Sequence, residues 1–232
     1  MRRSSDPDVI ARYAADESNT FFADGVEAIV FPQSEADVAE ILREANASGT
    51  PVTVSGGGTG LTGARVATEG GFVVTMELMR HAEPREGFEQ VSSVHDGLDY
   101  TVMLDAASGR AWCPPAITLD AVEALLAPRL LFPPAPTERS AMIGGAVAEN
   151  ASGARSFMHG PTRAWIEALE IVLPTGDTLH LARGDVLADG RTLEFAGVPL
   201  PDGNGLLTVL DVTDSKKAED ALRERNAALE EA

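Results

Sequence analysis

The chain has 232 residues, 44% of them hydrophobic and 23% charged, so it is long enough for one sizeable domain or two small ones, and it is neither collagen-like, mucin-like nor largely disordered. Eighteen basic residues against 36 acidic ones give a formal net charge of −18, which repels nucleic acid and anionic lipid heads. We therefore expect no nucleic-acid partner.

Cysteine and histidine usage bears on compartment and metal binding. The single cysteine, Cys113, cannot form an intrachain disulfide, and the four histidines are too widely spaced for a Cys/His metal cluster. Arg2 and Arg3 are not followed by an apolar stretch, and no window approaches the roughly eighteen uninterrupted apolar residues of a membrane span. We expect a cytoplasmic chain with no bound metal and no membrane span.

Strand and helix signals alternate near the start of the chain. Residues 26–31 form an apolar run of strand length. Ser34 stands at the N-cap position of a helix whose apolar residues recur at helical spacing until Gly49 ends it. Strands at 51–54 and 72–76 follow, with a glycine loop between them. The pattern predicts a β-α-β-loop-β unit.

A second, mixed lobe is predicted downstream. Its expected elements are strands at 91–94 and 101–104, a helix at 119–126 introduced by Thr118, and a hairpin with strands at 169–173 and 178–181. Pro174 at the first turn position of the hairpin, with Gly176 after it, favours a type II turn.

The composition changes again after Arg183. Strands are expected at 193–198 and 206–212, with a turn at 201–205 between them. Residues 214–232 are all helix formers with a thin apolar stripe, too weak for a lone helix to be stable in water. We expect a protruding helix that needs a partner.

The loop from Gly56 to Gly63 is the most informative stretch. Five glycines in eight positions allow consecutive backbone N–H groups to point into one concavity, and such a nest binds phosphate without side-chain charge. We expect an anion-binding loop, and the alternative is a purely structural loop.

Two familiar phosphate-binding motifs are excluded. A P-loop needs Lys and then Ser or Thr after Gly63, but the chain reads Ala64-Arg65-Val66. Gly58, Gly60 and Gly63 fit the dinucleotide fingerprint, but too few residues separate Gly63 from Phe72 for the crossover helix of a Rossmann unit.

A second small-residue cluster runs from Ile143 to Gly153. Its lack of bulk allows backbone to lie against a flat ligand, and two such segments together indicate one long cofactor. The alternative for this cluster is close helix packing by small residues.

Several motifs occur together and in order. They are Asp16-Glu17-Ser18, Ala28-Ile29-Val30-Phe31-Pro32, Pro51-Val52-Thr53, the glycine loop, Phe132-Pro133-Pro134-Ala135-Pro136, Ile143-Gly144-Gly145, Asn150-Ala151-Ser152-Gly153 and His159-Gly160-Pro161-Thr162-Arg163. In this combination the chain resembles, over about residues 15–183, the FAD-binding domain of the vanillyl-alcohol oxidase and p-cresol methylhydroxylase type. The similar branch includes the flavin subunits of glycolate oxidase and D-lactate dehydrogenase.

The resemblance implies an α+β fold with two lobes, about residues 20–80 and 85–184, that hold FAD between them. It implies that the pyrophosphate is bound by Gly56, Gly57, Gly58, Thr59, Gly60, Leu61 and Thr62. It implies that the ribityl chain and pyrophosphate are lined by Ser140, Ile143, Gly144, Gly145, Ala148, Asn150 and Gly153, and that the backbone of Ile171 meets the flavin.

The chain departs from the family pattern at three places. His159 stands where this branch usually has tyrosine, and Ala64-Arg65 replaces a further glycine. No histidine occupies the glycine loop, so a noncovalent flavin is expected. After Arg183 the family continues into a substrate-binding cap domain with catalytic and metal-binding histidines, which we expect to be missing here. His159 is the best catalytic candidate by position, although a lone histidine is more often structural.

Residues 191–232 resemble the end of a PAS sensor domain of bacterial histidine kinases: a hairpin remnant at about 185–214, then a signalling helix at 215–232. Thr213 or Asp214 suits the start of that helix. The alternative is a simple hairpin and helix with no signalling history.

The resemblance implies an FAD-dependent oxidoreductase module that transfers hydride from a small 2-hydroxy acid to the flavin. The implied partners are this substrate and a separate substrate domain or electron-acceptor subunit, with a weak homodimer through the C-terminal helix. The alternatives are a flavin-binding signalling module with a dimerising helix, and a truncated chimeric fragment without activity.

Overall fold

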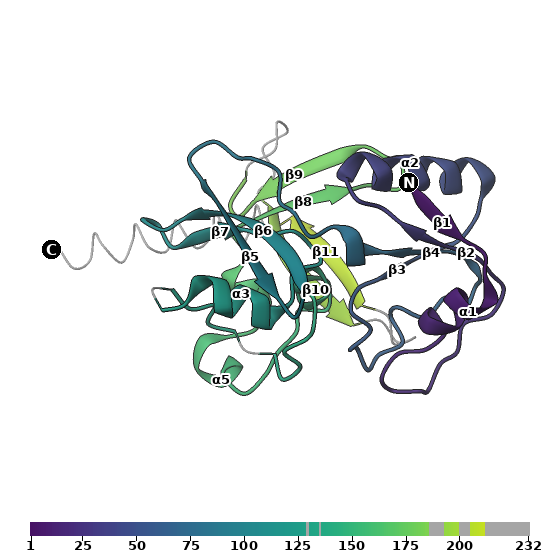
Figure 1. The fold of residues 1–232 in the computed structure, drawn as a ribbon, viewed down its shortest axis with the longest axis horizontal. Helices are drawn as coiled ribbons and strands as arrows, with labels where there is room; N and C mark the ends of the chain where they lie inside the picture. The colour runs from purple at the N-terminus through teal and green to yellow at the C-terminus, as the bar shows by residue number, and fades with distance from the viewer. Residues whose placement is uncertain (129, 135, 186–192, 200–204, 212–232) are drawn as a thin grey trace, which may run out of the picture.

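The computed structural model describes residues 1–128, 130–134, 136–185, 193–199 and 205–211. It has an α+β fold with one lobe built on a mainly parallel sheet and a second built on an antiparallel sheet (Figure 1). The expected α+β fold is therefore confirmed. The predicted helix at 215–232 lies outside the described residues.

The first lobe is a four-stranded sheet in the order β1-β2-β4-β3 with helix α2 against it. Its elements are β1 (Arg2–Ser4), α1 (Pro7–Ile10), η1 (Ala11–Tyr13), β2 (Val26–Phe31), α2 (Glu35–Ser48), β3 (Val52–Ser55), β4 (Gly71–Thr75) and η2 (Met76–Leu78). Every residue of β4 is buried, as expected for the central region of a sheet with parallel neighbours on both sides.

Helix α2 forms where its local sequence predicts. The Ser34 hydroxyl accepts a hydrogen bond from the Asp37 N–H at 3.2 Å, and Gly49 ends the helix in the left-handed conformation. Ile41 and Ala45 of this helix pack against Val30 and Val74 of the sheet. This buried cluster fixes the position of β3, and therefore of the loop that follows it.

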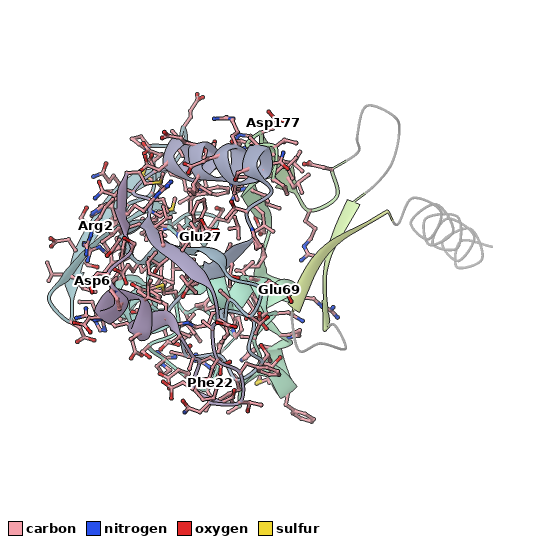
Figure 2. All side chains as sticks on the ribbon, turned by 90° about the vertical axis from the view of Figure 1, so that its right-hand side faces the viewer. Arg2, Asp6, Phe22, Glu27, Glu69 and Asp177 are labelled. Carbon is pink, nitrogen blue, oxygen red and sulfur yellow. The ribbon has the colours of Figure 1, made fainter. Side chains whose placement is uncertain are left out.

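Strand β1 was not among the predicted elements. It pairs antiparallel with β2, so the first lobe begins before residue 20. Arg2 and Arg3 lie on this edge strand: Arg2 stacks over the Phe31 ring, and Arg3 makes two hydrogen bonds to the Glu44 carboxylate at 2.9 and 2.7 Å. Figure 2 labels Arg2 on this strand. Such contacts provide no apolar periodicity for a sequence pattern to detect.

The second lobe is built on a three-stranded antiparallel sheet in the order β5-β6-β7, with helices against it. Its elements are β5 (Glu89–His95), β6 (Leu98–Asp105), β7 (Arg110–Trp112), α3 (Leu119–Leu126), α4 (Ile143–Ala148), α5 (Ser156–His159) and η3 (Thr162–Trp165). Thr118 caps α3 through a 3.2 Å bond from the Ala121 N–H, as its sequence predicts. Cys113 packs against this core, and burial raises the pKa of its thiol to about 12.

The hairpin of β8 (Ala168–Val172) and β9 (Thr178–Ala182) lies against the first lobe, although the sequence assigns it to the second. An Arg43 guanidinium nitrogen on α2 donates to the Gly176 carbonyl at 2.8 Å, and Thr178 contacts Glu35 at the start of α2. Figure 1 shows the hairpin beside α2, and Figure 2 shows Asp177 at the end of this helix. The hairpin thus packs on the first lobe through α2.

The predicted type II turn in this hairpin is wrong. A type II turn needs a positive φ at Thr175, but the positive φ occurs at Gly176, at +78°. Leu173 and Asp177 pair through a 2.8 Å backbone bond, which leaves a three-residue loop of the kind that ends in a left-handed glycine. A β-branched threonine strongly disfavours that conformation, so the glycine adopts it instead.

The predicted pair of strands after Arg183 is confirmed. Strands β10 (Leu193–Pro199) and β11 (Gly205–Asp211) form an antiparallel hairpin. Strand β11 contacts α4, and β10 contacts η3. The hairpin therefore lies against the second lobe. No helix in the part of the chain described here has the length and apolar character needed to cross a membrane.

Candidate cofactor-binding site

The glycine loop connects two strands that lie side by side. Strands β3 and β4 pair in parallel, with Val52 opposite Phe72, and the connection over residues 56–70 contains no helix. The exclusion of a Rossmann crossover is therefore confirmed. The loop instead extends from the end of β3 as irregular backbone.

Asp16 fixes the far end of this loop. Its carboxylate accepts a hydrogen bond from the Gly63 N–H at 2.6 Å, while its other oxygen accepts from the Ser18 N–H and hydroxyl at 3.0 and 2.6 Å. The neighbouring Glu17 N–H donates to the Gly60 carbonyl at 3.2 Å. Burial alone would raise the pKa of Asp16, but the bonds from Ser18 and Gly63 hold that pKa below its ordinary value.

Glycine is required at Gly58 and Gly63. Their φ angles are +80° and +79°, in the region that other residues rarely adopt. A Cβ at Gly58 would lie 1.8 Å from a terminal nitrogen of Arg65, and one at Gly63 would lie 2.5 Å from the Phe21 ring. The loop therefore depends on these glycines for its own conformation.

The loop presents free backbone donors. Within the described residues, no hydrogen bond involves the N–H groups of residues 57–62. A side chain at Gly60 would have no atom within 4 Å, so the backbone there faces open space. Unpaired N–H groups next to open space are the feature that an anion-binding nest requires.

The structure brings the second small-residue segment against this loop. A Cβ at Gly56 would lie 3.9 Å from Cα of Gly145, and one at Gly57 would lie 3.5 Å from the Ser140 carbonyl oxygen. Thr62 also donates to the Glu149 carboxylate at 3.4 Å. Two segments that are 87 residues apart in sequence at the Thr62–Glu149 contact thus form one continuous backbone surface.

The second segment has a mixed role. Gly145, like Gly60, faces open space. In contrast, a Cβ at Gly144 would meet Pro115 at 2.9 Å, and the Ile143 side chain lies in the core of the second lobe. The N–H groups of Gly144 and Ile143 donate to the carbonyls of Pro115 and Ile117. Close helix packing therefore explains part of this cluster, and an open backbone surface explains the rest.

The remaining candidates occupy different positions. The Ser140 hydroxyl donates to Glu138 at 2.7 Å, and the Asn150 side chain accepts from the Arg163 N–H at 3.0 Å. The Gly153 N–H donates to the Ser156 hydroxyl at 2.9 Å, and Ala148 is exposed. Ile171 pairs with Leu179 in the β8-β9 hairpin.

His159 has structural contacts. Its ring lies edge-on to Trp165 at 6.4 Å, and its carbonyl oxygen accepts from the Trp165 indole N–H at 2.9 Å. Within the described residues its ring makes no hydrogen bond, and no group of three His, Cys, Asp or Glu side chains is placed to hold a metal. These contacts favour the structural interpretation of His159.

Comparison with known proteins identifies the family. The sequence model described as "FAD binding domain" matches residues 26–182. The chain belongs to this FAD-binding domain family. The predicted resemblance over residues 15–183 is confirmed, while the match ends before the residues that suggested a PAS domain.

Three curated relatives show the same relationship over part of their length. The D-lactate dehydrogenase of Archaeoglobus fulgidus is 32% identical over 178 residues, covering 76% of this chain and 32% of the relative. Glycolate oxidase subunit GlcD of Bacillus subtilis is 30% identical over 156 residues, covering 66% and 29%. The D-2-hydroxyglutarate dehydrogenase of Stutzerimonas stutzeri is 30% identical over 179 residues, covering 76% and 34%. The chain spans about a third of these proteins.

A solved structure has the same fold. The 6-hydroxy-D-nicotine oxidase of Arthrobacter nicotinovorans superposes with a TM-score of 0.61 at 17% identity, covering 78% of this chain and 35% of that protein. The cofactor of the FAD-binding domain is FAD, and the backbone of this chain fits its diphosphate, because residues 57–62 offer free N–H groups beside open space.

Asp16 and Arg65 were not predicted to act at this site. In the sequence Asp16 stands out only as part of a family motif, although an Asp two residues before Ser is a pattern that forms a local turn. Arg65 is part of a departure from the family pattern. The sequence shows that Arg65 follows the loop, but not that its side chain packs against Gly58, and it gives no signal that connects Asp16 to Gly63.

Asp16 is expected to support the loop measurably. Replacing Asp16 with alanine leaves the buried Gly63 N–H unpaired, which costs about 1–3 kcal/mol. We expect urea unfolding to show this loss at neutral pH and FAD affinity to fall with it. Because the folded pKa of Asp16 is lowered, its stabilisation is present above the unfolded pKa of about 3.9 and disappears as the pH falls through the folded value. A difference between the proteins that does not shrink at all as the pH falls from neutral contradicts this role.

Proposed function

We propose that this chain is the FAD-binding module of a dehydrogenase that oxidises a small 2-hydroxy acid. The observation that carries the proposal is the close approach of the backbone at Gly56 and Gly57 in one lobe to Ser140 and Gly145 in the other, which forms one backbone surface for a long cofactor. The substrate class is supported by three relatives named D-lactate dehydrogenase, glycolate oxidase subunit and D-2-hydroxyglutarate dehydrogenase.

Each lobe has a separate task in this proposal. The N–H groups of the first loop hold the diphosphate, while the second segment, from Ser140 to Gly153, lies along the ribityl chain, and the backbone of Ile171 meets the flavin. Within that segment, Gly145 has the open backbone surface for close approach. The flavin is held noncovalently, since the loop has no histidine. The domain spans residues 1–184.

The residues of this chain bind and orient the cofactor. FAD, when bound, supplies the hydride acceptor for oxidation of the substrate carbon. The glycine loop fixes the diphosphate, so that the two lobes set the orientation of the rest of the molecule. We assign no catalytic base in this chain, because His159 packs on Trp165. The substrate-facing groups belong to a separate substrate domain or subunit.

A single-turnover experiment tests the substrate class. The FAD-loaded chain is incubated without oxygen with D-lactate, L-lactate, glycolate or D-2-hydroxyglutarate, and flavin absorbance is followed for hours. We expect at least one of these 2-hydroxy acids to cause a slow loss of the absorbance of oxidised flavin. Succinate, which lacks the hydroxyl group, should cause none. Flavin that stays oxidised with all four acids contradicts the dehydrogenase proposal and favours a flavin-binding module without this chemistry.

A signalling module is the second candidate. Strands β10 and β11 lie beyond the family match, and they contact η3 and α4. Because α4 contains the open Gly145 backbone, this hairpin adjoins an element of the proposed cofactor site. In this alternative, the state of the cofactor changes the hairpin and the helix that the sequence predicts after it.

The predicted C-terminal helix has its own test. Residues 215–232 are expected to pair with the same helix of a second chain, because Ala218, Leu222 and Leu229 form an apolar stripe that needs cover. Deleting everything after Asp214 should leave FAD binding intact and shift a weak dimer toward monomer in sedimentation velocity. A full-length chain that is already monomeric at high concentration contradicts the dimer.

A further inference from the structure

A cationic side chain lies directly against the glycine loop. A Cβ built on Gly58 would be 1.8 Å from a terminal nitrogen of the Arg65 guanidinium and 3.0 Å from its central carbon. The guanidinium therefore occupies the space that a side chain at Gly58 would need. Arg65 is only seven positions along the chain from Gly58, so the loop folds back over its own arginine.

The surroundings of Arg65 hold it in this position. One terminal nitrogen donates to the Arg12 carbonyl at 3.1 Å, and the guanidinium lies 5.4 Å from the centre of the Tyr13 ring. Tyr13 is itself fixed by a 2.8 Å hydrogen bond to Glu77. The Arg65 Nε is buried without a partner among the described residues. Burial lowers the pKa of Arg65, an effect opposed by the nearby Tyr13 and Asp16.

The charge of Arg65 matters because the rest of the chain disfavours an anionic ligand. The net charge is −18, and both phosphates of FAD are negative. The loop itself offers only the partial charges of its N–H groups. A guanidinium against Gly58 adds a positive charge, partly offset by the nearby Asp16, Glu17 and Glu77, within a partly buried environment where charges are screened less than at the surface.

We propose that Arg65 is a positioning residue for the diphosphate of FAD: it supports the loop at Gly58 and supplies positive charge from behind the free N–H groups. The proposal rests on the function proposed above. It gives a role to the Ala64-Arg65 departure from the family pattern, where the usual glycine has no charge to contribute. It also explains how an acidic chain holds a dinucleotide.

The test compares ligands with and without the diphosphate. The full chain is freed of flavin, and Kd values for FAD and riboflavin are measured by fluorescence at several salt concentrations for the wild type, R65Q, R65K and the control R110Q. Arg110, on β7, is a matched control because it pairs with Asp105 and its side chain is about half exposed. We expect R65Q to weaken FAD binding by about tenfold or more, with riboflavin binding unchanged.

The salt dependence of FAD binding and the R65K variant distinguish an electrostatic role of Arg65 from a purely structural one. R65Q should also reduce the salt dependence of FAD binding, and R65K should retain most of the affinity, since it keeps the charge. R65Q with wild-type FAD affinity overturns the proposal, as does an equal loss of FAD and riboflavin, which would show a structural role alone. A wild-type chain that binds no FAD contradicts the proposed function instead.

A measurement on the wild-type protein tests the same proposal without relying on the affinities of variants that could misfold. The Nε–H signal of Arg65 is followed by NMR in ¹⁵N-arginine-labelled protein and assigned from its absence in R65K. We expect it to shift on addition of ADP, which contains the diphosphate, and to stay in place with adenosine. A signal that stays in place at ADP concentrations where calorimetry shows that ADP binds overturns the proposal.

Discussion

A valine in place of Gly60 is expected to abolish retention of FAD without disturbing the fold. Gly60 has no atom within 4 Å of its Cβ position, and its φ is not positive, so the free protein accommodates a side chain there. The same side chain would fill the space beside the free N–H groups that receives the diphosphate. We expect the affinity for FAD to fall by at least about tenfold, the usual cost of steric overpacking at a fitted site.

The choice of Gly60 over Gly58 separates binding from folding. Valine at Gly58 must adopt a φ of +80° and displace Arg65, so it disturbs the loop itself, and the double substitution of Gly58 and Gly60 should remove binding completely. Retained FAD is measured by visible absorbance after gel filtration, and the fold by circular dichroism. Ala106→Val, in the exposed turn after β6, adds comparable bulk elsewhere and should change neither. Normal FAD retention by the Gly60 variant would show that the glycine loop is not part of the FAD-binding site.

The parts of the fold that the sequence predicted correctly are those with local causes. Helix α2 follows from Ser34 at its start, Gly49 at its end and apolar residues at helical spacing between them. The β8-β9 hairpin follows from a proline and a glycine between two apolar runs. Strand β1 has no such local signal in the sequence. Its two arginines are held by residues distant in the chain, Phe31 on β2 and Glu44 on α2.

The candidate site likewise has one part that the sequence predicts and another that only the structure shows. The glycine loop was found because its composition is itself the property that binds an anion. The anchor at Asp16 was missed because the carboxylate reaches Gly63 across 47 residues of sequence. Arg65 was missed because the short path from Gly58 to Arg65 does not reveal that the loop folds back over the arginine. Only the packing of the first lobe brings these groups together.

The small-residue segment shows why two interpretations remained open. Gly144 is small because α4 packs on Pro115, and Gly145 is small without any neighbour that requires it. A sequence pattern assigns both glycines to one cause, whereas the structure separates a packing glycine from one that faces open space. What indicates a cofactor surface is therefore the open space beside Gly145, and not the fact that the residue is a glycine.

The FAD-loaded chain by itself is expected to turn over 2-hydroxy acids at least about a hundredfold more slowly than the roughly 10 per second of a typical enzyme. The chain spans about a third of the relatives that carry those names, and the proposal places the substrate-facing groups outside it. His159, the best candidate for a catalytic base by sequence, instead supports Trp165 through its carbonyl oxygen. Substrate would therefore be neither oriented nor protected from water.

Oxygen provides a second readout of the same expectation. A flavin whose substrate side is open to solvent is exposed to side reactions that a closed active site prevents. We therefore expect the chain, once reduced with dithionite, to be reoxidised in air almost as fast as free reduced FAD. Dye reduction measures the turnover, with Gly60→Val as the control that lacks bound FAD. Saturable oxidation of a hydroxy acid at an ordinary enzymatic rate would mean that this chain supplies the catalytic groups itself. Slow reoxidation in air would mean that it already encloses the flavin.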